Sequence, residues 1–500
     1  MINRRDFLRQ TGALCAAVPF TLAAAHAVQK PPRNVLLITL DDMNWDSLGV
    51  TGCRIPGISP NLDRLASESV LFNNAYIMTS ICGPSRNAMM TGRFPHCSGS
   101  MGHGQQPPRD WSPPEHVTPS LSTYLNGQGF FTGAICKSGR LIDATFDMRF
   151  SEGPMGCFFE DRDPDTFYQR TTTILSEAKR RDRPFFLYAN PIDPHRPFPR
   201  TEMEQRLCKQ YEVQFADRLP KPNIGPGTPD TQYAPEAIDL PKFLPDIPEA
   251  RAHVAPYFDA VHRGDQCVGA ILRALDESGQ KEDTLIIFLS DHGMGVPGAK
   301  WSSYNYSLRT PLMIRWPGVT TPGATVDDAV VSSVDILPTV LEALGLPPME
   351  GIEGRSLAPF LLGQPPSDWR KSVYAAFNYM DDSKLDRYYP VRVEINGTYM
   401  YIWNAYLAVE GAPKEYHYAQ HELIQVMRAH ADPKLRARAE AFTHRSPEEV
   451  YNIRSDPGCW ENLAGNAAFR GIVEVLKSAL RQHMRETRDP LLGLFEKHLA

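Results

Sequence analysis

The sequence predicts an α/β fold: a large central mixed, mostly parallel sheet flanked by helices, followed by a smaller C-terminal α+β part with an antiparallel sheet. Near-continuous apolar runs, typical of strands buried on both faces, occur at 34–40, 130–136, 184–195 and 283–293. Helical stretches lie between them, and strands that alternate with helices indicate a parallel sheet covered on both sides. A length of 500 residues favours one large domain plus a smaller one.

The predicted strands end in residues that carry charge or can bind a metal. In chain order these residues are Asp41, Asp42, Lys137, His195, Asp291 and His292. Ligands of open α/β sheets bind beyond the carboxyl ends of the strands, so these side chains are expected to converge on one rim. Each has an ordinary alternative, because such residues also cap helices or occupy loops and turns. Their coincidence favours a shared site.

The clearest helix between the strands is predicted at 264–278. Its apolar residues recur three and four positions apart, so they lie on one face that packs against the sheet. These residues are Val268, Ile271, Leu272 and Leu275.

The large domain is expected to span 33–370 and the C-terminal subdomain 371–500, because the segment "GQPPSDWRKS" is typical of a boundary. A hairpin is predicted over 386–404, with Asn396-Gly397 as its turn. A closing helix is predicted over 467–485. Its apolar positions include Ile472, Val475, Leu476 and Leu480. The proline-rich stretch 213–250 is expected to form a long structured loop near the mouth of the pocket.

The charge of the chain excludes some classes of partner. The formal net charge is -6 and the isoelectric point is about 6.2, whereas a nucleic-acid binder needs a basic face to meet phosphates. An anionic substrate is compatible with this charge, because a few local cations can bind one in an acidic protein. No nucleic-acid partner is expected.

The first residues predict export. Arg4 and Arg5 form a twin-arginine pattern, an apolar stretch interrupted by Pro19 follows, and "AHA" offers a cleavage site after Ala27. We therefore expect residues 1–27 to be a signal peptide that the twin-arginine machinery of a bacterium recognises. The mature chain is expected in the periplasm or outside the cell, with no stable membrane span.

Eight cysteines follow that signal, and their spacing predicts no zinc knuckle because no CxxC pair occurs among them. An oxidising compartment permits disulfides, but the sequence does not pair them. Cys82 differs from the others because "CGPSR" places it at the start of a predicted helix. The residue could lie in a packed turn, act as a thiolate nucleophile, or be converted into another group.

The strand ends also indicate a metal site. Asp41, Asp42 and Asp291 are hard oxygen ligands suited to Ca²⁺ or Mg²⁺, and three carboxylates would repel one another without a cation. His292 is a softer ligand, but the oxygen-rich set favours a hard ion.

Cations are expected around this metal site. Arg86, Lys137 and Lys300 would add positive charge, and a divalent ion ringed by such residues suits a tetrahedral oxyanion, either phosphate or sulfate. The pattern therefore indicates an esterase for one of these anions.

The motif around Cys82 carries a family resemblance. "CGPSR" followed by "MMTGR" resembles the sulfatase signature C-x-P-S-R-x-x-L-x-T-G, with Met89 in place of leucine. "VLLITLDDM", "SPNLDRLASESVLFNNAY", "DPHRPF", "SDHG" and "RTPLMIRWPG" resemble further sulfatase blocks in the family's order. The resemblance covers essentially the whole mature chain and is closest to the N-sulfoglucosamine sulfohydrolase (heparan N-sulfatase) branch. It implies the alkaline-phosphatase-like sandwich fold.

The resemblance implies a role for each site residue. Cys82 would be converted by a formylglycine-generating or radical maturation enzyme into formylglycine, whose geminal diol attacks the sulfur atom. One Ca²⁺ would be bound by the formylglycine at position 82 and by Asp41, Asp42, Asp291 and His292.

Four further residues would handle the sulfate. Arg86 would hold the diol and a sulfate oxygen, and Lys137, His195 and Lys300 would bind the sulfate group. Either His195 or Lys300 would protonate the leaving amine or alcohol.

One position departs from the family pattern. A histidine usually follows two residues after the lysine and removes the diol proton in the second step, but "CKSGR" has Gly139 there. His96 or His103, in the loop after the signature, could replace it, or the sulfated intermediate would accumulate.

The resulting interpretation is a sulfatase that acts on a sulfated saccharide, most of all an N-sulfoglucosamine unit of the heparin or heparan type. The alternatives are an O-sulfatase for another polysaccharide and a phosphodiesterase or phosphonate hydrolase of the same superfamily. A phosphatase that uses the Cys82 thiolate is disfavoured, because that class makes no use of Asp41 and Asp42. A decayed glycan-binding homologue would explain Gly139.

Overall fold

The computed structural model describes residues 31–102, 118–138, 141, 144–150, 159–215, 229–380 and 388–499. The signal peptide predicted at 1–27 lies outside them. Residues Pro31–Ala500 form one compact unit. None of the helices in the described ranges combines the length and the apolar character needed to cross a membrane.

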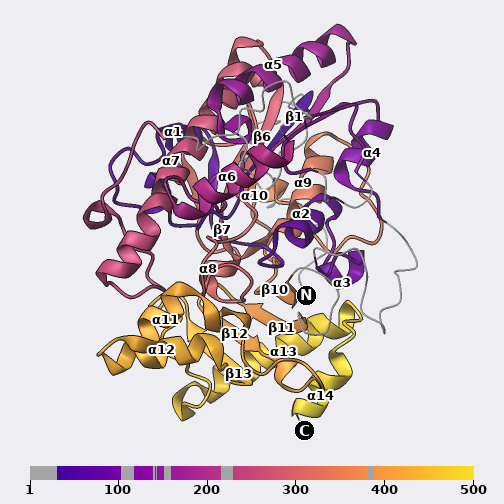
Figure 1. The fold of residues 1–500 in the computed structure, drawn as a ribbon. Helices are drawn as coiled ribbons and strands as arrows, with labels where there is room; N and C mark the ends of the chain where they lie inside the picture. Colours follow the sequence, from indigo (N-terminus) through magenta and orange to yellow (C-terminus); the bar gives the residue numbers. More distant parts are fainter. Residues whose placement is uncertain are drawn as a thin grey trace, which may run out of the picture. The chain divides into compact units, whose positions relative to one another are not determined.

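A mixed sheet of nine strands forms the centre of the described chain (Figure 1). Its order is β4 (Met148–Phe150), β3 (Phe131–Ile135), β5 (Phe185–Ala189), β1 (Asn34–Leu40), β6 (Thr284–Ser290), β7 (Arg309–Arg315), β2 (Val70–Tyr76) and β8 (Ala324–Val326), with β9 (Val331–Ser332) also paired to β2. Only β7 runs antiparallel to its neighbours in this sheet, as far as the described residues show. The four apolar runs expected to be strands are therefore β1, β3, β5 and β6, side by side and parallel.

The α-helices of the described chain connect and cover the strands. They are α1 (Pro60–Ser67), α2 (Cys82–Thr91), α3 (Pro95–Ser98), α4 (Leu121–Gly127), α5 (Pro164–Arg180), α6 (Glu202–Phe215), α7 (Pro248–Glu277), α8 (Asn305–Leu308), α9 (Ile336–Ala343), α10 (Ala358–Leu361), α11 (Glu422–Ala429), α12 (Pro433–Thr443), α13 (Arg470–Glu486) and α14 (Leu492–Leu499).

Both faces of the main sheet are covered, because successive side chains of a strand point to opposite faces. Leu36 and Ile38 of β1 pack in the core cluster that contains α1, α5 and α7, whereas Val35 and Leu37 pack in the cluster that contains α2, α4, α9 and α10. All seven residues of β1 are buried. The continuous apolar run at 34–40 is thus a strand between two helical layers.

The helix predicted at 264–278 is the second half of a longer one. Its four named apolar residues are buried as expected, but α7 begins at Pro248 and includes Pro256. Hydrophobic periodicity did not reveal the first half of the helix. Nearly every residue from Val254 to Asp265 is buried, so its apolar positions do not form a single stripe.

A second sheet occupies the C-terminal part. It is antiparallel, in the order β10 (Val373–Tyr379), β11 (Tyr388–Ile395), β12 (Tyr399–Trp403) and β13 (Glu448–Asn452). The predicted hairpin joins β11 to β12, and Gly397 has a φ of 79°, in the left-handed region that favours glycine. The predicted α/β fold class with a separate antiparallel sheet is confirmed, whereas the division at 370 stays a prediction.

The closing helix α13 packs on this second sheet. Of the four apolar positions named from the sequence, Leu476 and Leu480 are buried and Ile472 is partly buried. Val475 is 65% exposed. The buried residues of α13 are three or four positions apart, at Val473, Leu476, Leu480 and Met484, and Val475 falls outside that stripe.

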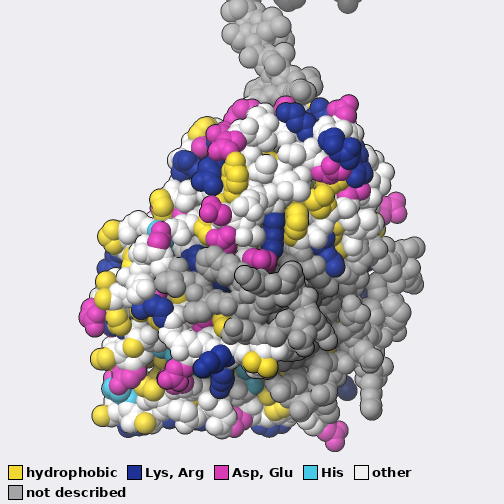
Figure 2. Space-filling view, turned by 45° about the horizontal axis from the view of Figure 1, so that its top comes forward, with side chains coloured by type: hydrophobic (Ala, Val, Ile, Leu, Met, Phe, Trp, Pro, Cys, Tyr) yellow, Lys and Arg dark blue, Asp and Glu magenta, His cyan; other side chains and the backbone are white. Residues whose placement is uncertain are grey.

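The surface of the molecule carries charges of both signs. On the face that Figure 2 shows, the described lysine and arginine side chains are interspersed with aspartates and glutamates. Such a mixed surface agrees with the small net charge of the sequence.

One buried carboxylate joins the second sheet to its closing helix. Asp489, just beyond α13, accepts hydrogen bonds from Arg392 Nε at 2.6 Å and from the Tyr374 hydroxyl at 2.6 Å. The side chains of Asp489 and Arg392 are both fully buried. Burial alone would raise the pKa of Asp489, but the Arg392 guanidinium holds it below its ordinary value.

We predict that Asp489→Ala lowers the free energy of unfolding by about 3–5 kcal/mol, because it leaves the Arg392 charge buried and unpaired. Since the folded-state pKa of Asp489 is depressed, the difference should be complete at pH 7 and shrink as pH falls below about 4, the ordinary aspartate value. Denaturant unfolding at several pH values measures both. The matched control is Asp368→Asn, whose side chain is 80% exposed beside Arg355; equal losses in the two variants would contradict the prediction.

Candidate active site

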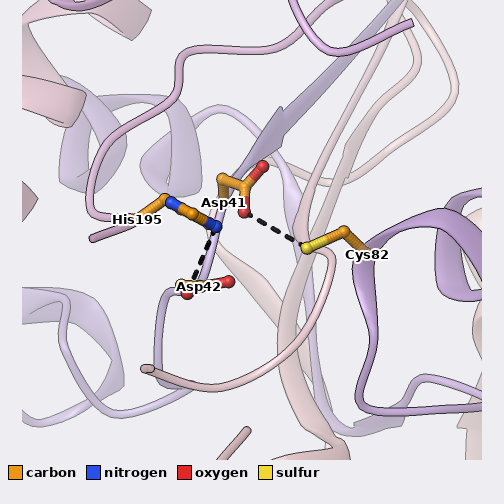
Figure 3. A group of neighbouring side chains, drawn as sticks. All are labelled: Asp41, Asp42, Cys82 and His195. Carbon is orange, nitrogen blue, oxygen red and sulfur yellow. Dashed lines mark hydrogen bonds and ion pairs between the residues drawn. The ribbon is translucent and has the colours of Figure 1, made fainter. Parts of the chain in front are cut away.

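The ends of the parallel strands and the start of α2 meet at one place. Figure 3 shows Asp41 and Asp42 at the end of β1 and Cys82 at the start of α2, with His195 approaching from the loop after β5. The remaining predicted site residues reach the same place through the contacts described below. They are Arg86, Lys137, Asp291, His292 and Lys300.

The backbone at the end of β1 turns so that two successive carboxylates serve one site. Side chains that follow each other in a strand point to opposite faces, but Asp42 has a φ of 65°, outside the extended region. This conformation is uncommon for a residue other than glycine and clusters at functional sites. The backbone N–H of Asp42 donates to Asp291 Oδ1 at 3.1 Å, which ties the ends of β1 and β6 together.

Cys82 is the first residue of α2 and lies at the centre of the cluster. Its Sγ is 3.1 Å from His292 Nε2, 3.7 Å from Asp41 Oδ1, and 3.6 Å from the Nζ atoms of both Lys137 and Lys300. The residue is only 3% exposed. The positive end of a helix and two ammonium groups favour negative charge at this position.

Arg86, one turn into α2, holds the carboxylates in place. Its Nε donates to Asp291 Oδ2 at 2.9 Å, and its Nη2 donates to Asp41 Oδ2 at 3.1 Å. Burial alone would lower the pKa of Arg86, but Tyr188 and these two carboxylates hold it well above its ordinary value. The guanidinium is thus a permanent cation between two strand ends.

The two lysines each pair with one carboxylate of β1. Lys300 Nζ contacts the two carboxylate oxygens of Asp42 at 2.7 and 2.8 Å, and Lys137 forms an ion pair with Asp41. Burial disfavours the charged form of both lysines, but Asp41 raises the pKa of Lys137 and Asp42 raises that of Lys300. Both amines therefore stay protonated in the folded chain.

The two histidines direct their Nε2 atoms into the cluster. His292 Nδ1 lies 2.9 Å from the Gly293 carbonyl, and His195 Nδ1 contacts the Arg196 carbonyl. Because a carbonyl only accepts, Nδ1 carries the proton in each ring and Nε2 of the neutral ring has a free electron pair. Nε2 of His195 is 4.0 Å from Asp42 Oδ2, and Nε2 of His292 is 3.4 Å from Asp42 Oδ1.

These side chains could hold a metal ion. Single donor atoms of Asp41, Cys82, Asp291 and His292 all lie within 4.8 Å of one another, and so do those of Asp41, Asp42, Cys82 and His195. Burial and the neighbouring Asp291 carboxylate raise the pKa of Asp41 well above its ordinary value. Close buried carboxylates of this kind are stabilised by a cation.

Three residues of the site were not found from the sequence. Thr39, Tyr188 and Asn190 surround Nη1 of Arg86 at 2.7, 2.9 and 2.8 Å. Thr39 lies in β1, Tyr188 lies in β5 and Asn190 directly follows β5. A single polar residue in or beside a buried strand belongs to no motif that the sequence could reveal. Only the alternation of polar with apolar side chains near the strand ends could have pointed to them.

The histidine expected to replace the missing base takes another position. His96 Nε2 lies 2.9 Å from the Thr487 hydroxyl, and its Nδ1 is 3.8 Å from Asp489. Burial lowers the pKa of His96 to about 4. These contacts tie His96 to the end of α13, whereas His103 and Gly139 lie outside the described residues.

Family models match most of the chain. The model described as Sulfatase matches residues 33–346, and the model described as N-sulphoglucosamine sulphohydrolase, C-terminal, matches residues 299–410. The first match includes every predicted site residue, and the second spans the end of the main sheet and the first three strands of the antiparallel one.

Two relatives are similar over nearly the whole chain. Human N-sulphoglucosamine sulphohydrolase is 28% identical, and the similarity covers 97% of each chain. An ulvan-active sulfatase of Formosa agariphila is 27% identical over 93% of this chain and 77% of its own.

Solved structures share the fold at lower identity. A protein in complex with its substrate, D-glucosamine-2-N,6-O-disulfate, has a TM-score of 0.65 and 19% identity and covers 92% of this chain and 99% of its own. The phosphonate monoester hydrolase of Agrobacterium radiobacter has a TM-score of 0.62 and 20% identity, with coverage of 92% and 96%. With the family model matched over more than half of its length, the chain belongs to the sulfatase family, whose enzymes hydrolyse sulfate esters or sulfamates.

Proposed function

We propose that this sulfatase removes sulfate from a sulfated glycan, and specifically the N-sulfate of a glucosamine unit of the heparin or heparan type. The observation that carries the proposal is the position of Cys82, at a helix start among three carboxylates and three cations. The choice of glycan is supported by the C-terminal family model and by the human relative, which is similar over 97% of the chain.

Cys82 is proposed to be the precursor of formylglycine, produced by a maturation enzyme of the host. One hydroxyl of the hydrated aldehyde would attack sulfur and take over the sulfo group as the amine or alcohol leaves. The second hydroxyl would then lose its proton and form the aldehyde C=O again, while the bond from carbon to the sulfated oxygen breaks and releases sulfate. A phosphatase that used the thiolate itself would need cations around the sulfur atom but no carboxylates. Here Asp41 lies 3.7 Å from the sulfur atom, and a carboxylate at this place suits a hydroxyl bound beside a metal.

The donor set fits one Ca²⁺, held by Asp41, Asp42, Asp291, His292 and the oxygen of residue 82. Carboxylate oxygens predominate in this set, as a hard cation requires, and the Nδ1 of His292 is held by a carbonyl so that Nε2 is available. When bound, the ion supplies positive charge next to the sulfate oxygens.

The charges of the site support joint binding of the metal and the sulfate. Three carboxylates face the cations of Arg86, Lys137 and Lys300. Burial alone would lower the pKa of His292, but Asp291 raises it to about 9, so cations offset the carboxylates of the cluster before ligands bind. The sulfate group of the substrate carries one negative charge and the released sulfate ion carries two, so bound sulfate would offset one or both charges of a Ca²⁺ ion, whose burial without an anion is costly. The ammonium groups of Lys137 and Lys300 now contact carboxylates and are close enough to Cys82 to turn toward a sulfate oxygen.

The leaving group needs a proton. His195 Nε2 and Lys300 Nζ both face Cys82 and Asp42, so either can stand next to the amine or alcohol that departs. His195 is held by its Nδ1 contact to the Arg196 carbonyl, which leaves Nε2 to carry the transferred proton. Arg86 acts mainly on the enzyme side, since it keeps Asp41 and Asp291 in position.

Location and domain division belong to the same proposal. The twin-arginine pattern at Arg4 and Arg5 supports export of the folded protein to the bacterial periplasm or beyond. Residues 33–370 would then carry the chemistry, and residues 371–500 would complete the substrate pocket.

We predict that a peptide containing residue 82, from protein made in its native host, has the mass of formylglycine rather than cysteine. Cys82→Ala should lower sulfate release by at least about 1,000-fold, as removal of a nucleophile does. Cys53→Ala, at a buried cysteine in the loop between β1 and α1, should retain activity. An unmodified thiol in fully active protein would contradict the proposed mechanism.

We predict that a chelator abolishes sulfate release and that Ca²⁺ restores it. Calcium at a hundred times its Kd should also raise the free energy of unfolding by about 2.7 kcal/mol. Asp42→Asn should lose this stabilisation, whereas Asp328→Asn, at an exposed position, should keep it. A calcium-independent unfolding curve for the unaltered protein would count against the metal site.

We predict that the enzyme releases sulfate from N-sulfoglucosamine units of heparin-derived saccharides. Sulfate release is measured by ion chromatography, with O-sulfated saccharides and a phosphate monoester as comparison substrates. If the enzyme released sulfate from O-sulfated sugars alone, the protein would be an O-sulfatase and the proposed N-sulfatase function would be wrong. Binding of the saccharides without any release would indicate the decayed, glycan-binding homologue.

A further inference from the structure

Arg196, the residue after His195, lines a pocket that includes none of the predicted site residues. A Cβ atom placed on Gly295 would lie 3.1 Å from Asp42 Oδ2 and 3.2 Å from Arg196 Cδ, so the arginine stem passes close to the proposed metal ligands. The pocket has a volume of about 800 Å³, and Arg196, Phe198, His253 and Glu422 are among the residues that line it. The pocket is therefore linked to the candidate site through Arg196, whose stem lies near Asp42.

The Arg196 guanidinium is held by imidazoles and not by carboxylates. Its Nη2 is 3.0 Å from His253 Nε2, and its Nη1 is 3.4 Å from His421 Nε2. It also lies over the ring of Phe198, 5.4 Å from the centroid. Within the described part of the chain, no carboxylate oxygen lies within ion-pair distance of this guanidinium, although buried arginines are ordinarily paired.

The contact with His421 brings two hydrogen-bond donors together. His421 caps α11, and its Nδ1 accepts the backbone N–H of Leu423 at 3.2 Å. A neutral imidazole that accepts at Nδ1 carries its proton on Nε2, so an N–H faces the Arg196 Nη1 group. The N–H groups of Arg196 and His421 cannot bond to each other. An acceptor oxygen placed beside both would accept a hydrogen bond from each.

The imidazoles leave the positive charge of Arg196 uncancelled. Burial lowers the pKa of His253 to about 4 and that of His421 to about 3, with the Arg196 charge as the next cause in each case. Both rings are therefore neutral near pH 7. Burial lowers the pKa of Arg196, whereas Asp42 and, to a smaller extent, Glu422 raise it. Glu422 is 76% exposed and 3.5 Å from His253 Nδ1. It faces the imidazole on the side away from the guanidinium.

We propose that Arg196, His253 and His421 form a second anion subsite, which binds a further acidic group of the saccharide while its sulfate occupies the site at residue 82. This inference rests on the proposed function. The acidic group is either the carboxylate of a neighbouring uronic acid or a second sulfate on the same glucosamine, since both present planar or tetrahedral oxygens to a forked guanidinium.

Four probes test the subsite and distinguish the two sources of the anion. The first is N-sulfoglucosamine, which has only the sulfate that is removed, and the second is its 6-O-sulfated form. The third is the disaccharide of N-sulfoglucosamine with a uronic acid, and the fourth is that disaccharide with its carboxyl group reduced to an alcohol. The values of kcat and KM are measured for each.

Arg196→Gln should lower kcat/KM by about 10- to 100-fold for the 6-O-sulfated sugar, the uronate disaccharide, or both, the range for a lost hydrogen bond to a charged group. The values for N-sulfoglucosamine and the reduced disaccharide should stay within about twofold of the unaltered enzyme. The matched control is Arg206→Gln on α6, which removes an exposed charge from the same pocket and should have little effect.

A parallel loss on all four probes would overturn the inference, because it would assign Arg196 a structural role. Unchanged values for both doubly charged probes would also overturn it. A binding measurement separates this outcome from failure of the proposed function. By calorimetry, Cys82→Ala protein should bind the uronate disaccharide or the 6-O-sulfated sugar more tightly than the singly charged probes, and adding Arg196→Gln should remove the difference. If the unaltered enzyme released no sulfate, the result would count against the proposed sulfatase function but not against the second anion subsite.

Discussion

The buried Arg86 guanidinium is the interaction on which the rest of the site depends. It donates to Asp291 and Asp41 and is surrounded at Nη1 by polar groups of β1 and of the end of β5, so one side chain of α2 joins the ends of three strands. Two carboxylates as close as these would repel one another in a buried site. The fixed cation lets them coexist, and it thereby sets the position of Cys82, one helical turn away.

Lys137 and Lys300 also hold buried carboxylates in place by pairing with them. Lys137 and Lys300 neutralise the two carboxylates of β1 while their Nζ atoms stay 3.6 Å from Cys82. In the proposed function each lysine would exchange its carboxylate for a sulfate oxygen when a metal binds that carboxylate. A site balanced in this way remains stable before its ligands arrive, although all of its charged groups are withdrawn from water.

The regions around the two sheets contribute different side chains. The strand ends of the main sheet carry the clustered carboxylates and cations, whereas the C-terminal part contributes the helix α11, whose cap His421 contacts Arg196. The same C-terminal part binds His96 through Thr487 and Asp489 and so keeps that imidazole for packing. In the proposed second subsite, recognition of the saccharide beyond its sulfate would draw on both parts of the chain.

The sequence by itself determined the strands, the polar residues at their ends and the helix that begins at Cys82, because continuous apolar runs and helix starts are local patterns. The resemblance of its motifs to the sulfatase blocks was enough for the family. Only the tertiary structure decided how the charges pair, since Arg86 meets Asp291 across 205 positions of the chain. It also decided the surroundings of Arg196, whose imidazole partners lie 57 and 225 positions away. Contacts between such distant segments depend on the packing of whole layers, and no local period or spacing records them.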